Sequence, residues 1–149
     1  MSFKPDKKEA NGSSIALIAE YGGKRLLLAG DAFPARIVAS LDRFNADERL
    51  KLDAYKLSHH GSKKSNSSEL LRRVACSQYL ISSNGSYFGH PDAEAMARVL
   101  VHGGKNPMLT FNSNLDFARR WSKKASLRGA PAFRTRYPEG AEGIAIDFE

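Results

Sequence analysis

The chain of 149 residues is 42% hydrophobic and carries a formal net charge of +7, with four histidines and one cysteine. A length of this order predicts one domain, and an ordinary apolar fraction excludes a wholly disordered chain. The longest uninterrupted apolar run, Ile15–Ala19, is too short to cross a bilayer, and we see no signal-peptide pattern. Cys76 is the single cysteine, so no internal disulfide can form. We therefore expect a cytoplasmic protein without a membrane contact.

Strand-like and helix-like patterns alternate along the chain. Residues 1–10 are polar and charged, so we predict a disordered segment there and a folded domain over residues 11–149. A Gly-Gly pair, which supplies the positive φ of a tight hairpin turn, separates the first two strands. The predicted strands are Ser14–Tyr21, Arg25–Ala29, Asp53–Leu57, Gln78–Ser82 and Pro107–Phe111, followed by two candidate closing strands at Ala132–Arg136 and Gly143–Phe148.

Three segments carry the apolar stripe of a helix that packs on a sheet. Asn66 is placed to cap the second of them, with Glu69 three residues later reaching back as in a capping box. Strands that alternate with helices predict an α/β fold with a largely parallel sheet. Because three helices cover one face of such a sheet, its other face needs a partner layer. The predicted helices are Pro34–Phe44, Asn66–Cys76 and Pro91–Val101.

Polar side chains follow three successive strand-like runs. Asp31 ends the first run, the pair His59 and His60 ends the second, and a loop rich in Ser, Asn and Gly that leads to His90 ends the third. Ligands of open α/β sheets sit outside the carboxyl ends of the strands, so we expect these residues to converge. Carboxylate and imidazole are ligands of zinc, manganese and iron, and the set therefore predicts a transition-metal site. It holds too few ligands for a complete hydrolytic metal centre.

Each of these features also has a purely structural explanation. Asp31 before a helix is a common cap, and the histidine pair can be hydrogen-bonded residues at a strand end. Because neighbours on an extended strand point to opposite sides, we expect one of His59 and His60 to be the ligand and the other to lie behind it or to face substrate. The loop from Ser82 to Pro91 either presents donors and a helix start to an anion or is a plain connection.

The excess positive charge gathers in one segment. Residues 117–138 contain seven Lys or Arg and no Asp or Glu, which indicates either a solvated surface or a strip that contacts phosphate groups. In the second case, Trp121 and Phe133 would be available to stack on bases. The strip residues, which we take as candidate nucleic-acid contacts, are Arg119, Arg120, Lys123, Lys124, Arg128, Arg134 and Arg136.

Three motifs, taken in order, resemble the metallo-β-lactamase fold in its ComEC-like branch. They are Leu-Ala-Gly-Asp at residues 28–31, Lys-Leu-Ser-His-His-Gly-Ser at 56–62 and Ser-Asn-Gly-Ser-Tyr-Phe-Gly-His-Pro at 83–91. The match runs from Asn11 to Gly104. Each motif is weak alone, but the three in this order are specific. The resemblance implies an αββα sandwich and a centre of two metal ions, zinc or manganese.

The resemblance also implies roles for individual residues. Asp31 would bridge the two metal ions, and His59 or His60 would be the last histidine ligand. His90 would be a site residue or would face the substrate. We take His90 and Asn84, which lie in the same loop, as candidate catalytic residues.

The same family carries a His-x-His-x-Asp-His motif upstream of the Gly-Asp segment, and this chain contains no His-x-His pair. We therefore expect the C-terminal half of an αββα sandwich, a mixed sheet with about three helices on one face. In the first hypothesis, the chain is part of a metal-dependent hydrolase of phosphodiesters such as those of nucleic acid. Another chain or segment, or self-association, would complete its site. In the second, it is a non-catalytic half-domain that binds nucleic acid or docks a partner. A third hypothesis is an inert truncated product.

Overall fold

The computed structural model describes residues 3–44, 48–122, 129, 131–140 and 143–148. Its main sheet has the strand order β1-β2-β4-β6-β7-β8, and β3 pairs with β5 in a separate small sheet. The strands are β1 (Leu17–Tyr21), β2 (Lys24–Leu28), β3 (Leu50–Lys51), β4 (Ala54–Lys56), β5 (Val74–Ala75), β6 (Gln78–Ile81), β7 (Met108–Phe111) and β8 (Arg134–Arg136). The helices are α1 (Glu9–Gly12), α2 (Pro34–Phe44), α3 (Ser68–Arg73), α4 (Ala93–His102) and α5 (Asp116–Arg119), with short 3₁₀ turns η1 (Ser58–Gly61) and η2 (Arg120–Ser122).

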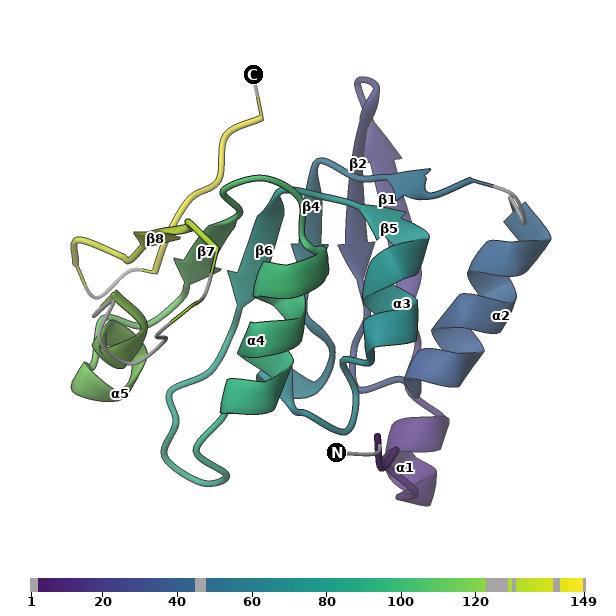
Figure 1. Cartoon of the computed structure of the whole chain (residues 1–149), viewed down its shortest axis with the longest axis horizontal. Helices are drawn as coiled ribbons and strands as arrows, with labels where there is room; N and C mark the ends of the chain where they lie inside the picture. The colour runs from purple at the N-terminus through teal and green to yellow at the C-terminus, as the bar shows by residue number, and fades with distance from the viewer. Residues whose placement is uncertain (1–2, 45–47, 123–128, 130, 141–142, 149) are drawn as a thin grey trace.

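The main sheet is mixed. β1 and β2 form an antiparallel hairpin, in which Leu17 pairs with Leu28, and the other neighbouring strands of this sheet run parallel. Parallel neighbours need a crossover connection, and α2, α3 and α4 supply the crossovers between β2, β4, β6 and β7. Figure 1 shows these three helices on one face of the sheet. The predicted class, an α/β fold with a mixed sheet and helices on one face, is confirmed.

The core lies between the main sheet and these three helices. One register row crosses four parallel strands through Leu27, Tyr55, Tyr79 and Leu109, and each of the four side chains is at most 2% exposed. Burying one aliphatic or aromatic side chain stabilises a fold by about 1.5–3 kcal/mol, so this row is a main source of stability. The buried helical residues that pack on the sheet are Ile37, Val38, Leu41, Leu70, Leu71, Met96, Val99 and Leu100.

The second helix is shorter than predicted. Ser67 is its cap, because the Ser67 hydroxyl accepts a hydrogen bond from the Leu70 amide at 3.1 Å, and Asn66 is not. The helix ends at Arg73 because Val74 enters β5, which pairs with β3. Within the described ranges, no helix has the length and apolar character needed to cross a membrane.

One of the two candidate closing strands is present, as β8 beside β7. Residues 143–148 form no strand. Ile146 and Phe148 instead lie beside the β1–β2 hairpin, where they line a pocket together with Ala19 and Leu26. Residues 146–148 therefore lie next to the hairpin without extending the sheet.

The second face of the main sheet carries apolar side chains that α2, α3 and α4 do not cover. Leu26 and Leu28 flank the inward-facing Leu27, so the strand pleat turns them to this side. Leu17, which pairs with Leu28, is 46% exposed. We call this surface the open face. Its partly or largely exposed apolar residues are Leu17, Leu26, Leu28, Leu80 and Met108.

Candidate functional site

Three loops meet at one edge of the main sheet. The His59 amide donates to the Gly30 carbonyl at 2.8 Å, which holds the loop after β4 against the loop after β2. The His59 and His90 ring centroids lie 5.5 Å apart, and His60 Nδ1 lies 2.5 Å from the Ser82 carbonyl oxygen, so the loop after β6 joins the other two. The structure therefore brings the three predicted histidines together at the carboxyl ends of neighbouring parallel strands.

The turn that carries His59 and His60 has a rare backbone conformation. Their φ angles are 46° and 55°, in the left-handed region that costs a non-glycine residue roughly 1–2 kcal/mol. Such strain persists where the surrounding structure imposes it, and it clusters at functional sites. From the sequence we expected an extended backbone here, with the two rings on opposite sides, but the structure has a turn instead. The centroids of the His59 and His60 rings lie 6.1 Å apart. Which of the two rings is the ligand stays a prediction.

A buried asparagine holds this turn in place. Asn66 has no exposed surface, and its Nδ2 donates to the carbonyls of Ser58 and Ser62 at 2.8 Å each, on either side of the histidine pair. Sequence reasoning assigned Asn66 to a helix cap and so missed this role. A signal was available, because Ser67 and Ser68 follow Asn66 and are themselves favoured cap residues.

A buried carboxylate from the N-terminal segment packs against the same turn. The side chain of Asp6 is 7% exposed, and it accepts hydrogen bonds from the Lys8 amide at 3.0 Å and from Asn11 Nδ2 at 2.7 Å. Burial alone would raise the pKa of the Asp6 carboxyl, but these hydrogen bonds and the nearby His59 outweigh burial and lower the pKa below its usual value of 3.8. Sequence reasoning missed Asp6 because it lies in the segment that we predict as disordered. The disorder itself stays a prediction.

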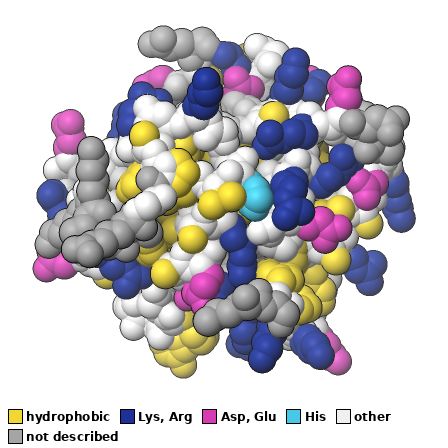
Figure 2. Space-filling view, in the orientation of Figure 1, with side chains coloured by type: hydrophobic (Ala, Val, Ile, Leu, Met, Phe, Trp, Pro, Cys, Tyr) yellow, Lys and Arg dark blue, Asp and Glu magenta, His cyan; other side chains and the backbone are white. Residues whose placement is uncertain are grey.

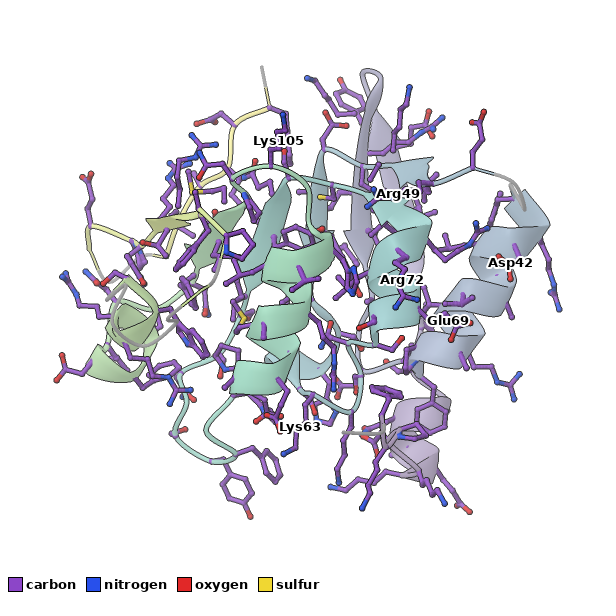
Figure 3. All side chains as sticks on the ribbon, in the orientation of Figure 1. Asp42, Arg49, Lys63, Glu69, Arg72 and Lys105 are labelled. Atoms are coloured by element: carbon purple, nitrogen blue, oxygen red, sulfur yellow. The ribbon has the colours of Figure 1, made fainter. Side chains whose placement is uncertain are left out.

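Asp92 joins the histidine turn to the start of α4. Its Oδ2 accepts a hydrogen bond from the Lys63 amide at 2.8 Å, and its Oδ1 lies 3.4 Å from His90 Nδ1. Figure 3 labels Lys63 near the N-terminal end of α4, where the Lys63 ammonium pairs with Glu94 at 3.0 Å. Burial lowers the pKa of His90, and the Asp92 carboxylate opposes that shift. The neutral imidazole of His90 is therefore favoured.

We expect the folded state to lose stability as the pH falls below about 6.5. Burial lowers the pKa of His90 and of His102, and at His102 the charges of Arg72 and Arg49 (both labelled in Figure 3) add to the effect of burial. The unfolded chain then binds protons at a higher pH than the folded chain, which destabilises the fold on acidification. The melting temperature should therefore be lower at about pH 5.5 than at about pH 7.5. A variant with His90→Gln and His102→Gln should show a smaller fall, and an equal fall would contradict this account.

The loop after β6 borders a pocket of about 450 Å³ beside the histidines. The candidate catalytic residues Asn84 and His90 both line it, together with His60. Asn84 Oδ1 accepts hydrogen bonds from the amide and the hydroxyl of Ser86, at 3.1 and 2.7 Å, so the Asn84 side chain is oriented within its own loop. The other lining residues are Ser82, Ser83, Gly85, Tyr87, Phe88 and Asn112. Hydroxyl, amide and imidazole groups thus face one pocket.

Asp31 follows β2 at the same edge of the sheet. Its amide donates to the Ser14 hydroxyl at 2.9 Å. Burial lowers the pKa of Lys56, and the negative charge of Asp31 opposes that shift. Within the described part of the chain, no group of three or more His, Cys, Asp or Glu side chains is placed to hold a metal ion. The side chains have the chemistry that zinc or manganese requires, but these residues do not fit a self-contained metal centre.

Arg120, one residue of the predicted basic strip, borders the site. The Nη2 of Arg120 donates to the carbonyls of Gly89 and Pro91, at 3.3 and 3.0 Å, so the strip is joined to the loop that carries His90. Figure 2 shows that Lys and Arg side chains, in dark blue, also spread over the helical face. Other exposed strip residues in the structure are Arg119, Arg134 and Arg136, whereas Lys123, Lys124 and Arg128 lie outside the described residues.

The aromatic side chains of the strip are not exposed for stacking. Trp121 is 3% exposed and Phe133 is partly buried against the core. The prediction that Trp121 stacks on bases is therefore wrong, because its ring belongs to the core beside α5. Tyr87 and Phe88, which border the pocket, are 87% and 61% exposed and pack edge to face with ring centroids 4.7 Å apart. Exposed aromatic surface thus lies on the loop after β6.

A comparison with known proteins gives one distant similarity to a curated protein. Over 99 residues, the chain is 28% identical to the ComE operon protein 3 of Bacillus subtilis (strain 168), a stretch that covers 66% of this chain and 12% of that protein. The chain thus corresponds to a small part of that relative's length. No protein-family model matches the chain, and no solved structure matches it.

Proposed function

We propose that this chain forms part of a metal-dependent hydrolase with a metallo-β-lactamase fold of the ComEC-like branch. The observation that carries the proposal is the meeting of three loops, each after a parallel strand, that places His59, His60 and His90 at one edge of the sheet. Strand ends of this kind are where α/β proteins bind ligands. The order of the three motifs and the distant similarity to ComE operon protein 3 add support.

The proposed centre needs ligands from outside the described residues. Two zinc ions take five or six protein side chains between them, and Asp31 with one or two histidines supplies fewer. We propose that the remaining ligands come from a segment or chain that packs on the open face, where apolar side chains stay uncovered by the helices. Zinc or manganese, when bound there, would supply an activated water and stabilise negative charge in the reaction.

A phosphodiester is the substrate class that the proposal favours. The pocket presents hydroxyl, amide and imidazole groups, which can donate hydrogen bonds to phosphate oxygens. The net charge of +7 would steer an anionic substrate toward the protein. Arg120, which bonds the loop that carries His90, places positive charge next to the site.

Co-expression tests this proposal. The chain would be produced alone and together with a segment that bears the His-x-His-x-Asp-His motif and the other half of the sandwich. We expect hydrolysis of bis(p-nitrophenyl) phosphate only in the complex, and loss of that activity on treatment with a chelator. A matched complex in which the first two histidines of the added motif are alanine serves as the control. Equal hydrolysis in the complex and in this control would remove the proposal.

A second candidate function is nucleic-acid binding without catalysis. The observation that favours it is the group of exposed arginines that includes Arg119 and, on β8, Arg134 and Arg136. Such a surface would contact the phosphate backbone rather than read sequence. The two functions are separable, because backbone binding needs neither the histidine turn nor a metal.

Salt dependence tests this second function. Each phosphate contact adds about −0.9 to the slope of log K against log salt for duplex DNA. Changing Arg119, Arg134 and Arg136 to Gln should therefore make the slope shallower by up to about 2.7, if all three make contacts. The matched control changes Lys51, Arg72 and Lys105, which are also exposed, to Gln and removes the same net charge. An identical change of slope in both variants would show that the effect comes from net charge and not from contacts made by the three arginines.

A further inference from the structure

We propose that Asp6 is a positioning residue for His59, which it holds in the tautomer that carries its proton on Nδ1. The Asp6 Oδ2 atom lies 3.4 Å from His59 Nδ1, and both side chains are mostly buried, at 7% and 15% exposed. Asp6 lies outside the three motifs of the site. Any role of His59 in a reaction rests on the proposed function. The tautomer of the His59 ring does not, because it is a property of the isolated chain.

The Asp6 carboxylate is itself held in place. Oδ1 accepts from the Lys8 amide at 3.0 Å, and Oδ2 accepts from Asn11 Nδ2 at 2.7 Å. The Asp6 amide in turn donates to the carbonyl of Lys64, three residues beyond Gly61, the last residue of the histidine turn. The backbone of Asp6 thereby holds the N-terminal segment just after the turn, and its side chain lies against His59 within the turn.

The charge on Asp6 decides between the two tautomers. Asn11 Nδ2 also lies 3.4 Å from His59 Nδ1, so an unprotonated Nδ1 has a donor within reach. One of the two N–H groups of that amide already donates to Asp6 Oδ2 at the shorter distance of 2.7 Å. A lone pair on Nδ1 would face the buried carboxylate, which is unfavourable, whereas an N–H on Nδ1 would give Oδ2 a second donor beside Asn11 Nδ2. Hydrogen bonds to charged groups are the stronger ones, so the Nδ1–H form should prevail.

This tautomer leaves Nε2 as the unprotonated nitrogen of His59. An imidazole whose Nδ1–H faces a carboxylate is fixed in orientation and keeps the lone pair on its other nitrogen. The His90 ring, with its centroid 5.5 Å away, and the pocket beside it lie on the same edge of the sheet. Asp6 thus leaves Nε2 as the nitrogen of His59 that can accept a hydrogen bond or bind a ligand.

Nitrogen-15 NMR of the imidazole rings in the isolated chain tests the inference, at a pH where the rings are neutral. In the wild type, we expect the Nδ1–H form of His59 to exceed the Nε2–H form by at least about tenfold. Asp6→Asn should reverse the preference toward Nε2–H, because the new amide can donate to Nδ1. Glu9→Gln removes an exposed carboxylate of the same segment and should leave the His59 spectrum unchanged.

Two outcomes would overturn the inference. One is a wild-type His59 in the Nε2–H form, and this result does not depend on how any variant folds. The other is an Asp6→Asn variant that keeps its melting temperature and shows the wild-type tautomer. Neither outcome bears on hydrolysis by the complex, and absence of hydrolysis would leave the tautomer as it is. The inference and the proposed function therefore fail separately.

Discussion

Replacement of Gly61 by alanine should destabilise the fold by about 3 kcal/mol, which corresponds to a fall in melting temperature of about 6–12 °C. Gly61 has a φ of +85°, which L side chains rarely adopt, and a Cβ there would lie 2.6 Å from Pro91 Cβ and 3.2 Å from Pro91 Cα. The Gly61 carbonyl also accepts a hydrogen bond from the Asp92 amide at 3.0 Å, so the two loops cannot separate without losing it. Thermal denaturation followed by circular dichroism measures the effect.

Gly89→Ala is the matched control for this prediction. Gly89 also has a positive φ, of +67°, but a Cβ there would meet nothing within 4 Å. The Gly89→Ala variant should therefore be destabilised only by the cost of placing alanine at a positive φ, about 1 kcal/mol. Equal losses in the two variants would show that the close approach of the His-His-Gly turn to Pro91 contributes nothing.

If the proposed complex hydrolyses phosphodiesters, Asp31→Asn should reduce its turnover by at least about 100-fold. Replacing a residue that only supports a metal ligand typically lowers activity 10- to 100-fold, and replacing Asp31, which we propose as a ligand, should lower activity at least as much. Asn keeps the shape of the side chain, and the hydrogen bond from the Asp31 amide to Ser14 does not involve that side chain. The free energy of unfolding should therefore change by no more than about 0.5 kcal/mol. Steady-state kinetics of the complex and denaturation of the isolated chain give the two numbers.

Asp42→Asn is the control for charge. Asp42, labelled on α2 in Figure 3, pairs with Arg73 at 2.6 Å on the helical face and has no place in the site. The Asp42→Asn substitution removes the same formal charge as Asp31→Asn and should leave turnover unchanged. If Asp31→Asn also leaves turnover unchanged, Asp31 serves the loop after β2 as a capping residue and not the reaction.

The sequence predicted the layers of this fold because its periodic patterns are strong. Pro34–Phe44 was expected as a helix and is one, with the same bounds, because its apolar residues recur on one face and Pro34 suits a first turn. The strand at Gln78–Ile81 was expected within one residue. The second helix was not placed correctly, because Asn66 and Ser67 are both good caps and only the packed turn decides between them.

The site was predictable only in part, because some of its contacts join residues that are far apart in the sequence. The position of His59, His60 and His90 at one edge follows from strand order, which the motifs reveal. The contributions of Asp6 and Asn66 do not follow, because they depend on contacts made across the fold by residues with no pattern of their own. Trp121 was misassigned for the same reason, since an aromatic residue among arginines can be turned inward by the packing of one short helix.

The metal content of the purified protein tests the central claim most directly. The claim is that the chain supplies part of a metal centre and needs a further segment to complete it. Inductively coupled plasma mass spectrometry of the isolated chain, after dialysis against metal-free buffer, should give far less than one zinc or manganese ion per chain. The complex with the segment that bears His-x-His-x-Asp-His should hold about two. An isolated, monomeric chain that retains about two ions would contradict the claim.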